Sequence, residues 1–213
     1  MKINDNYLRE QLKHVYWLNG GCCAGKTTMT RKFVEELGFQ TLPDEVMRYR
    51  PFTDPEEYPA LQDPHPGLNW DEWFNRPTDV KYQWLCDLVV EMMEFYVVDL
   101  LRMPTDRPIM IELGIMPEHI LPFIPKGRMI CLYTSDDEIE RLYFFREDHK
   151  MILDVINLTA DPAATIKHAN KTNVKFSNEI TKACMEAGIK MLKRTPELSV
   201  EEQFRLVREH FGI

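Results

Sequence analysis

Two glycines, a lysine and a threonine near the start of the chain have types and a spacing that suit contact with phosphate groups. The eight residues from Gly20 to Thr27 read G-G-C-C-A-G-K-T and match G-x-x-x-x-G-K-[S/T] at every fixed position. The glycines permit a tight turn and a close approach of the backbone to a ligand. Lys26 provides a mobile cation for the β- and γ-phosphates, and the Thr27 hydroxyl provides a Mg²⁺ ligand. The stretch predicts a triphosphate site made by Gly20, Gly21, Cys22, Cys23, Ala24, Gly25, Lys26, Thr27 and Thr28.

The segments on either side of this loop have the patterns that its chemistry requires. Residues 14–19 are short, apolar and rich in β-formers, which predicts a strand. Residues 26–37 place apolar side chains at four-residue spacing and end at Gly38, which predicts a helix. The amino end of that helix would direct its N–H groups and its positive dipole end toward a bound phosphate.

Strand-like and helix-like segments alternate along the rest of the chain. This alternation favours right-handed crossovers and a mainly parallel sheet, in a three-layer α/β arrangement. Ligands of such sheets bind beyond the carboxyl ends of the strands, where Asp44 and Glu112 fall. Further strands are predicted at 39–42, 109–112, 128–133 and 188–192, and further helices at 78–103, 135–145, 162–187 and 199–211.

Residues 51–77 have a different composition from the rest of the chain, with six prolines and several aromatic residues. Proline at this density prevents a regular helix or a central strand. A loop of this length in a compact domain is often functional, so we interpret it as an insertion that folds over the surface. Trp70 and Trp73 are candidates for a substrate cover. Trp84 belongs to the apolar stripe of the following helix, which favours core packing.

Composition limits the class of protein. A net charge of −8 without a cluster of lysines and arginines argues against a general nucleic-acid binder. No apolar run approaches the length of a membrane span, and no signal peptide is visible at the N-terminus. Five cysteines at irregular spacing indicate reduced thiols in a cytoplasmic protein, with Cys22 and Cys23 as small fillers. We therefore expect one domain over 1–213, monomeric or homodimeric.

The loop, the tryptophan-rich insertion, the long helix and the stretch Glu112–Pro117 resemble the P-loop nucleoside and nucleotide kinase-like proteins, which include shikimate and adenylate kinases. The closest likeness is to a poorly characterised bacterial subset with a motif reading roughly E-G-x-x-L-L-P. Here that stretch reads E-L-G-I-M-P, which is one residue shorter and has Leu113 after the carboxylate. The resemblance implies a P-loop NTPase fold with a five-stranded parallel sheet in the order 2-3-1-4-5. It also implies a lid over the phosphates near 141–160.

The resemblance assigns roles to two acidic residues. In related kinases an acid after the second strand orients the acceptor hydroxyl or holds Mg²⁺ through water, which points to Asp44. The same residue also suits the N-cap of a following helix. Glu112 ends a buried strand and would hold a Mg²⁺-bound water or contact the acceptor, although a carboxylate at a strand end is often only solvated.

Arginines in the predicted lid and beside the second strand could each act at the site or have an ordinary surface role. Arg141 and Arg146 fall where the resemblance places the lid, and lid guanidinium groups stabilise charge on the transferring phosphoryl group. The alternative is an exposed helix face with ordinary ion pairs. Arg48 and Arg50 would contact the acceptor or stay solvated. The loop at 194–197 would border the adenine through its backbone.

These features predict an ATP-binding, Mg²⁺-dependent kinase for a small-molecule hydroxyl or phosphate acceptor, such as a nucleoside, a nucleotide or a small metabolite. The alternative is a nucleotide sensor or an ATPase that transfers no phosphate to an acceptor. Asn170–Asn173 superficially resembles a guanine-reading motif, but it ends in asparagine and lies inside a predicted helix, so a GTPase switch is rejected. The catalytic candidates are Lys26, Asp44, Glu112, Arg141 and Arg146, with Thr27, Asp44 and Glu112 as candidates for Mg²⁺.

Overall fold

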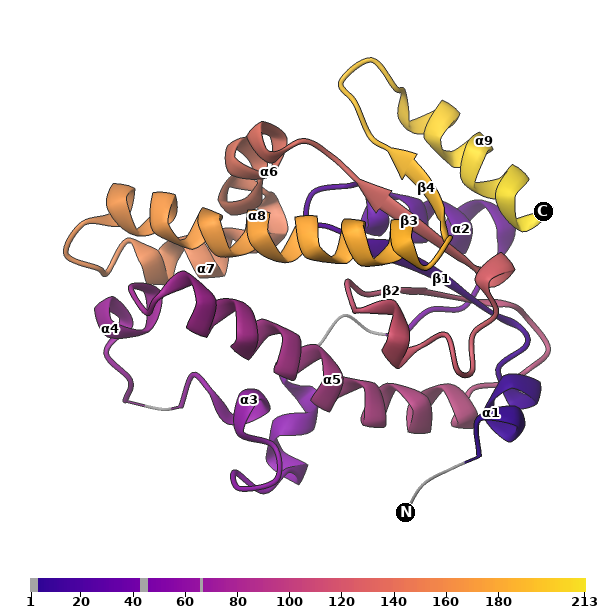
Figure 1. Cartoon of the computed structure of the whole chain (residues 1–213), viewed down its shortest axis with the longest axis horizontal. Helices are drawn as coiled ribbons and strands as arrows, with labels where there is room; N and C mark the ends of the chain where they lie inside the picture. The colour runs from indigo at the N-terminus through magenta and orange to yellow at the C-terminus, as the bar shows by residue number, and fades with distance from the viewer. Residues whose placement is uncertain (1–3, 43–45, 66) are drawn as a thin grey trace.

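The structure is a computed structural model, and it describes residues 4–42, 46–65 and 67–213 (Figure 1). Four strands and nine α-helices alternate with short 3₁₀ turns over these residues. The elements in chain order are α1 (Asp5–Gln11), β1 (Val15–Gly20), α2 (Lys26–Leu37), η1 (Val46–Phe52), α3 (Pro59–Gln62), α4 (Trp70–Phe74), α5 (Thr78–Arg102), β2 (Ile109–Glu112), η2 (Pro117–His119), η3 (Lys126–Arg128), β3 (Met129–Tyr133), α6 (Asp136–Leu142), η4 (Tyr143–Phe145), η5 (Glu147–His149), α7 (Lys150–Ile156), α8 (Pro162–Glu186), β4 (Lys190–Lys193) and α9 (Val200–Phe211).

The four strands form one parallel sheet in the order β2-β1-β3-β4. The register pairs Leu18 of β1 with Glu112 of β2, and Gly20 of β1 with Leu132 of β3. These pairs bring the carboxyl ends of the three strands to the same edge, beside the loop that follows β1. The expected α/β class with a parallel sheet is confirmed.

The expectation of a fifth strand at 39–42 is wrong for the described residues. Only Gln40 pairs with the sheet, through a single parallel bridge to Ile109 at the outer side of β2. Its N–H donates to Pro108 O at 2.9 Å, and its carbonyl accepts from Met110 N at 2.8 Å. The sequence leaves little room for more pairing, because Gly38 ends α2 in the left-handed region and Pro43 has no N–H for a ladder. The bridge occupies the place beside β2 that the implied order gives to that strand.

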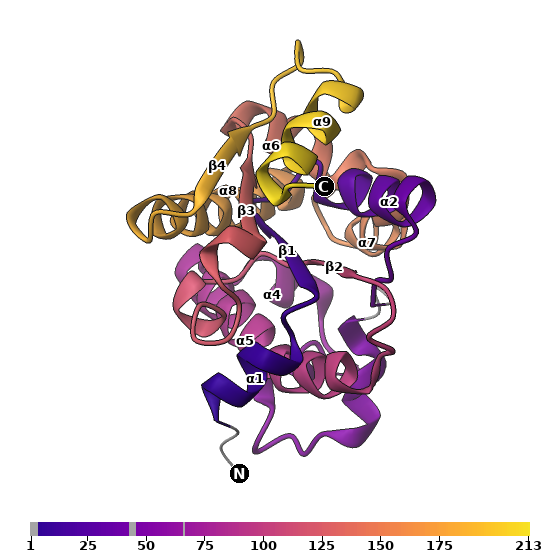
Figure 2. The ribbon, with the colours of Figure 1, turned by 90° about the vertical axis from the view of Figure 1, so that its right-hand side faces the viewer.

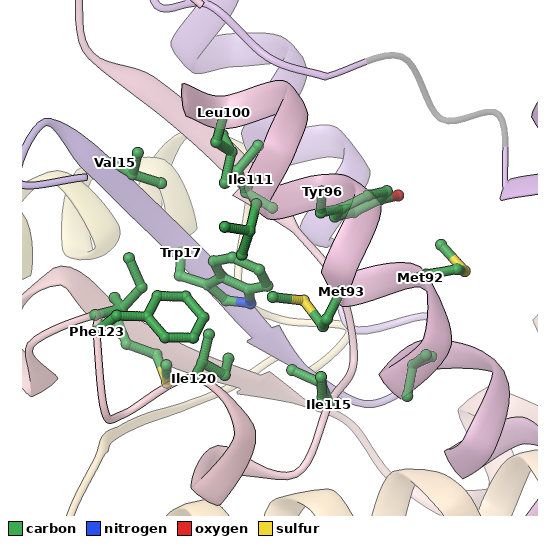
Figure 3. Packing of buried hydrophobic residues seen from close by; sticks show 14 of the residues in the cluster. Val15, Trp17, Met92, Met93, Tyr96, Leu100, Ile111, Ile115, Ile120 and Phe123 are labelled. Atoms are coloured by element: carbon green, nitrogen blue, oxygen red, sulfur yellow. The ribbon is translucent and has the colours of Figure 1, made fainter. Parts of the chain in front are cut away.

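Helices cover both faces of the sheet, as Figure 2 shows with α2 and α9 on one side and α5 and α8 on the other. Alternate strand residues supply the two cores because strand side chains point to opposite faces in turn. Leu18 packs with Met29 and Phe33 of α2. Trp17 is fully buried on the opposite face, among the side chains of α5 and of the segment after β2 (Figure 3).

The proline-rich insertion folds against α5. Trp84 donates from Nε1 to the carbonyls of Ala60 at 3.1 Å and Asp63 at 3.2 Å, and the Glu91 carboxylate accepts from the N–H groups of Ala60 and Leu61. The insertion does contain regular helix, contrary to expectation, but only in single turns at α3 and α4. Among the described residues, no helix has the length and low polarity that crossing a bilayer requires.

Two helices outside the insertion were not predicted. Ser135 and Ser199 each stand three residues before a glutamate, a spacing that predicts a capping box, and only one of them caps its helix. α1 and α7 have seven residues each, too few for a periodic pattern to stand out. Ser199 caps α9 as its spacing predicts, with its hydroxyl accepting from Glu202 N at 3.1 Å. Ser135 makes no side-chain bond at the start of α6, and Glu138 three residues later pairs with Arg141 instead.

The start of α5 holds a buried lysine beneath the aromatic side chains of α4. Lys81 is 6% exposed, and its ammonium lies 4.4 Å from the ring centre of Trp73 and 4.8 Å from that of Phe74. Its Nζ atom donates to the carbonyl of Phe74 at 3.5 Å. Burial, with a smaller contribution from Arg76, lowers the pKa of Lys81 from its ordinary 10.5 to about 8.

Replacing Lys81 by methionine is expected to stabilise the fold at pH 7 by about 1–3 kcal/mol, because the variant no longer buries a charge. Between pH 8 and 10.5 the unfolded wild type binds the proton that its folded state has released. Wild-type stability therefore rises relative to the variant across that window, and the difference shrinks. Urea unfolding at pH 7, 9 and 10 measures this. Lys13→Met, at an exposed lysine, is the control, and equal curves for Lys81→Met and wild type at all three pH values would contradict the prediction.

Candidate functional site

The segment between β1 and α2 turns sharply at residues with positive φ angles. Gly20 has φ +121°, Cys23 has φ +57° and Gly25 has φ +90°. A Cβ atom on Gly20 would lie 1.9 Å from the carbonyl oxygen of Leu132 on β3, so only glycine fits there. The turn ends where α2 begins at Lys26. The backbone itself therefore requires the glycines of the motif.

The ammonium group of Lys26 folds back over the loop. Its Nζ atom donates hydrogen bonds to the carbonyl oxygens of Gly20 at 3.2 Å and Gly21 at 2.6 Å. A phosphate oxygen carries negative charge and is a stronger acceptor than a carbonyl group. Lys26 is therefore placed to exchange these backbone contacts for contacts with a nucleotide phosphate.

Thr27 and Glu112 meet beside the loop. Oγ1 of Thr27 donates to Oε2 of Glu112 at 2.8 Å, because the β1–β2 register brings the end of β2 next to the start of α2. The hydroxyl proton is thus engaged by the carboxylate, and the oxygen lone pairs of Thr27 remain available to a metal ion. Mg²⁺ at nucleotide sites takes only one or two protein oxygens, with phosphates and water as its other ligands. The pair fits that requirement.

The shifted glycine after Glu112 has a structural explanation. Gly114 lies against the loop, and a Cβ atom on it would lie 2.8 Å from the carbonyl oxygen of Gly20. Leu113 packs against the main core, and its carbonyl accepts from Nε1 of Trp17 at 3.3 Å. The close approach that a glycine permits is therefore kept, one residue further along the chain.

A cleft of about 250 Å³ borders the loop, and two arginines line it. Arg146 lies there and hydrogen-bonds to the thiol of Cys23. Arg194 also lines the cleft and donates to the carbonyl of Cys23. Arg141 instead lies on the exposed face of α6, with two hydrogen bonds to Glu138 at 3.1 and 2.9 Å. The structure thus brings Arg146 to the loop and leaves Arg141 in a helix-surface ion pair.

The loop cysteines are thiols in different surroundings. Cys22 is half-buried, and its N–H donates to the hydroxyl of Ser177 at 2.9 Å. Cys23 is buried, and burial is the main reason that the pKa of its thiol is raised. A raised pKa keeps Cys23 protonated at neutral pH, in agreement with its interpretation as a small filler.

A second cavity, of about 330 Å³, includes both Thr27 and Glu112 in its wall. The apolar part of its lining is Val34, Leu42, Tyr96 and Ile111, and the polar part is Thr27, Thr30, Arg31, Glu35, Thr41 and Glu112. Asp44, the other acid predicted for this side, lies outside the described residues.

The two arginines predicted as acceptor contacts are engaged within the protein. Arg48 pairs with Asp99 and stacks on the ring of Tyr49. Arg50 donates to three carbonyls of the insertion, those of Leu61, Gln62 and Pro64. These bonds fasten η1 to α5 and to the insertion, and they give both arginines a structural task.

The tryptophans of the insertion pack against other elements. Trp73 is 9% exposed and meets Trp84 edge-on at 5.2 Å, and Trp70 lies 6.1 Å from Trp73. Their cluster also contains Phe144 of η4 and Ile156 of α7. Among the described residues, the linings of the two cavities beside the loop do not include Trp70 or Trp73. The insertion is thus joined to the segment predicted as a lid, and the role of the two tryptophans as a substrate cover stays a prediction.

Ser177 and Gln203 touch the loop and were missed from the sequence, whereas Arg194 was predicted only within a segment whose backbone borders the adenine. Ser177 accepts from the N–H of Cys22, Arg194 donates to the carbonyl of Cys23, and Gln203 donates to the carbonyl of Ala24 at 3.0 Å. Their separation from the loop exceeds 150 residues in each case, so no local pattern connects them to it. For Gln203 the available signal was a glutamine beside the apolar face of the predicted terminal helix.

No protein-family model matches the chain, and no curated protein matches it in sequence. Two solved structures of deoxyadenosine kinase from M. mycoides are similar to it. The structure with dCMP and a flexible dCDP bound has a TM-score of 0.46 at 12% identity, over 93% of this chain and 97% of that chain. The structure with bound dCTP has a TM-score of 0.44 at 13% identity, with the same coverage. A likeness of this strength defines neither a substrate nor an activity.

Proposed function

We propose that this chain is a Mg²⁺-dependent kinase that transfers the γ-phosphoryl group of ATP to a small-molecule acceptor. The observation that carries the proposal is the 2.8 Å hydrogen bond between Thr27 and Glu112, directly beside the glycine loop and Lys26. A loop that only holds phosphate needs no carboxylate next to its threonine. A loop that also binds Mg²⁺ needs one to orient the metal ligand.

Each side chain at the site has a distinct task in this proposal. Lys26 binds the β- and γ-phosphates, and Arg146 neutralises charge that develops on the transferring group. Thr27 would hold Mg²⁺ directly, with Glu112 acting on it through the Thr27 hydroxyl or a bound water. Mg²⁺ supplies charge neutralisation at the phosphate oxygens when bound. Roles for Asp44 and Arg141, and closure of a lid over 141–160, stay predictions.

The second cavity is the proposed place of the acceptor, because Thr27 and Glu112 form part of its wall. Its volume of about 330 Å³ suits a small metabolite. The acceptor oxygen forms a bond to the γ-phosphorus while the bond to the β,γ-bridging oxygen breaks. ADP leaves, and the hydroxyl proton passes to a carboxylate or to water. A phosphate acceptor reacts in the same way through an oxygen that is already ionised.

The test follows γ-phosphate from labelled ATP into a panel of nucleosides, nucleotides and small hydroxy compounds. Transfer to at least one acceptor is expected to saturate with acceptor concentration. Removal of Mg²⁺ with a chelator is expected to lower the rate by about 100-fold or more, because the phosphate oxygens then lose the positive charge of the ion that neutralises them. Restoring Mg²⁺ should return the rate, which controls for damage by the chelator.

Two outcomes would contradict the proposal. Tight binding of ATP without turnover against a broad panel would favour a nucleotide sensor. Release of inorganic phosphate at a rate that no acceptor changes would favour a simple ATPase.

A further inference from the structure

The carbonyl groups of the phosphate loop are held by donors from the C-terminal part of the chain. Gln203 of α9 donates from Nε2 to the carbonyl of Ala24 at 3.0 Å, and Arg194, just after β4, donates to the carbonyl of Cys23. Gln203 is 2% exposed, so its bond to Ala24 is shielded from water. The contacts span 179 and 171 residues of sequence.

Holding a carbonyl also fixes the direction of the next N–H group. A trans peptide unit is planar, and its C=O and N–H bonds point to opposite sides. The bond from Gln203 to Ala24 O therefore turns the N–H of Gly25 away from Gln203. The bond from Arg194 to Cys23 O turns the N–H of Ala24 away from Arg194 in the same manner. Loops that bind phosphate need such N–H groups turned together toward the anion.

The position of Gln203 is itself fixed by packing. Its neighbour Phe204 and Val207 one turn later are buried in the core that α9 shares with α2. On the loop side, a Cβ atom on Gly25 would lie 2.9 Å from Oε1 of Gln203, which is closer than real Cβ atoms come. The amide therefore sits directly against the loop, at the position where Gly25 has a positive φ.

We infer that Gln203 is a positioning residue for the triphosphate, which acts through the Ala24–Gly25 peptide, with Arg194 in the same role at Cys23–Ala24. The inference rests on the proposed function only in that a nucleotide binds at the loop. Without its donor, the Ala24 carbonyl is free to rotate toward other partners, and the Gly25 N–H rotates with it. The variant should therefore lose affinity for the phosphates of the nucleotide and keep its affinity for the nucleoside part.

The experiment compares wild type with Gln203→Met, which keeps the side-chain length and lacks the N–H donor, and with Gln203→Glu, whose carboxylate repels the carbonyl. Arg205→Met on the same helix is the matched control, because Arg205 is exposed and pairs only with Glu202 and Glu209 among the described residues. Calorimetry measures the dissociation constants of ATP, ADP and adenosine with Mg²⁺ present. Thermal unfolding shows that each variant is folded.

Gln203→Met is expected to weaken ATP and ADP binding by about 10-fold and to leave adenosine binding within about 2-fold of wild type, because one buried hydrogen bond to the loop is lost. Gln203→Glu should weaken ATP and ADP further, and Arg205→Met should match wild type. Equal ATP affinity for Gln203→Met and wild type would overturn the inference, as would an equal loss for ATP, ADP and adenosine. If the wild type bound no nucleotide, both the inference and the proposed function would fail. If the variants showed the expected changes in affinity but the wild type transferred no phosphate, only the proposed kinase activity would fail.

Discussion

Replacing Lys26 by alanine is expected to weaken ATP binding by about 10- to 100-fold, because a charge-assisted hydrogen bond to phosphate contributes about 1.5–3 kcal/mol. The rate of phosphoryl transfer should fall further, by about 10²–10³-fold, because charge builds up on the transferring group after binding. In the structure, the Lys26 ammonium contacts the carbonyls of Gly20 and Gly21, within the turn that the nucleotide would occupy.

The Lys26 variant needs a control on the same helix and a check on folding. Lys32 lies two turns along α2 and pairs with Glu36 at 2.5 Å, so Lys32→Ala removes a lysine from α2 without touching the loop. Calorimetry with ATP and a transfer assay are the measurements, and circular dichroism monitors folding. Unchanged affinity and turnover in folded Lys26→Ala would refute the assignment of the loop.

A loop of this kind is predictable from sequence because its requirements are local. Gly20 must tolerate a positive φ and a carbonyl 1.9 Å from its missing Cβ, and Gly25 must open a helix. Those needs select residue types at fixed spacing within one short segment. α2 follows with the predicted bounds, and β2 matches its prediction as well, because each has a strong apolar pattern between clear stop signals.

The partners of the loop were not predictable because they arise from the tertiary fold. Ser177 and Gln203 lie on two helices that pack on opposite faces of the sheet, and only the completed sheet brings both to Gly20–Gly25. A helical pattern shows which face is buried, but it does not show which backbone group that face will meet. Gln203 illustrates the limit, since a buried polar residue signals a partner without naming it.

The charged residues show a similar limit. Arg141, Arg146, Arg48 and Arg50 all allowed a site role or a structural one in the sequence. Arg141 and Arg48 pair with carboxylates and Arg50 donates to backbone carbonyls within the protein. Arg146 lines the cleft beside the loop. Long arginine side chains reach partners on several elements, so spacing along the chain does not decide between these roles.

Replacing Glu112 by glutamine is expected to raise the Mg²⁺ concentration for half-maximal rate by about 10- to 100-fold, because residues that orient a metal ligand have effects of that size. Glutamine still accepts the Thr27 hydroxyl but lacks the negative charge that holds the metal or its water. The rate should recover in large part at high Mg²⁺. Glu35→Gln is the matched control, because Glu35 lines the same cavity, whereas the Thr27 hydroxyl donates its hydrogen bond to Glu112.

The Mg²⁺ titration also separates the two roles that Glu112 can have. If Glu112 were a general base, its replacement would lower kcat by about 10²–10⁴-fold, and no concentration of Mg²⁺ would restore the rate. Thr27→Val removes the hydroxyl that Glu112 contacts. If the two residues act together, the rate of the double variant should fall by less than the product of the two single effects. Fully multiplicative losses would show that the 2.8 Å bond does not couple the two residues, and Glu112 would then act directly on the acceptor.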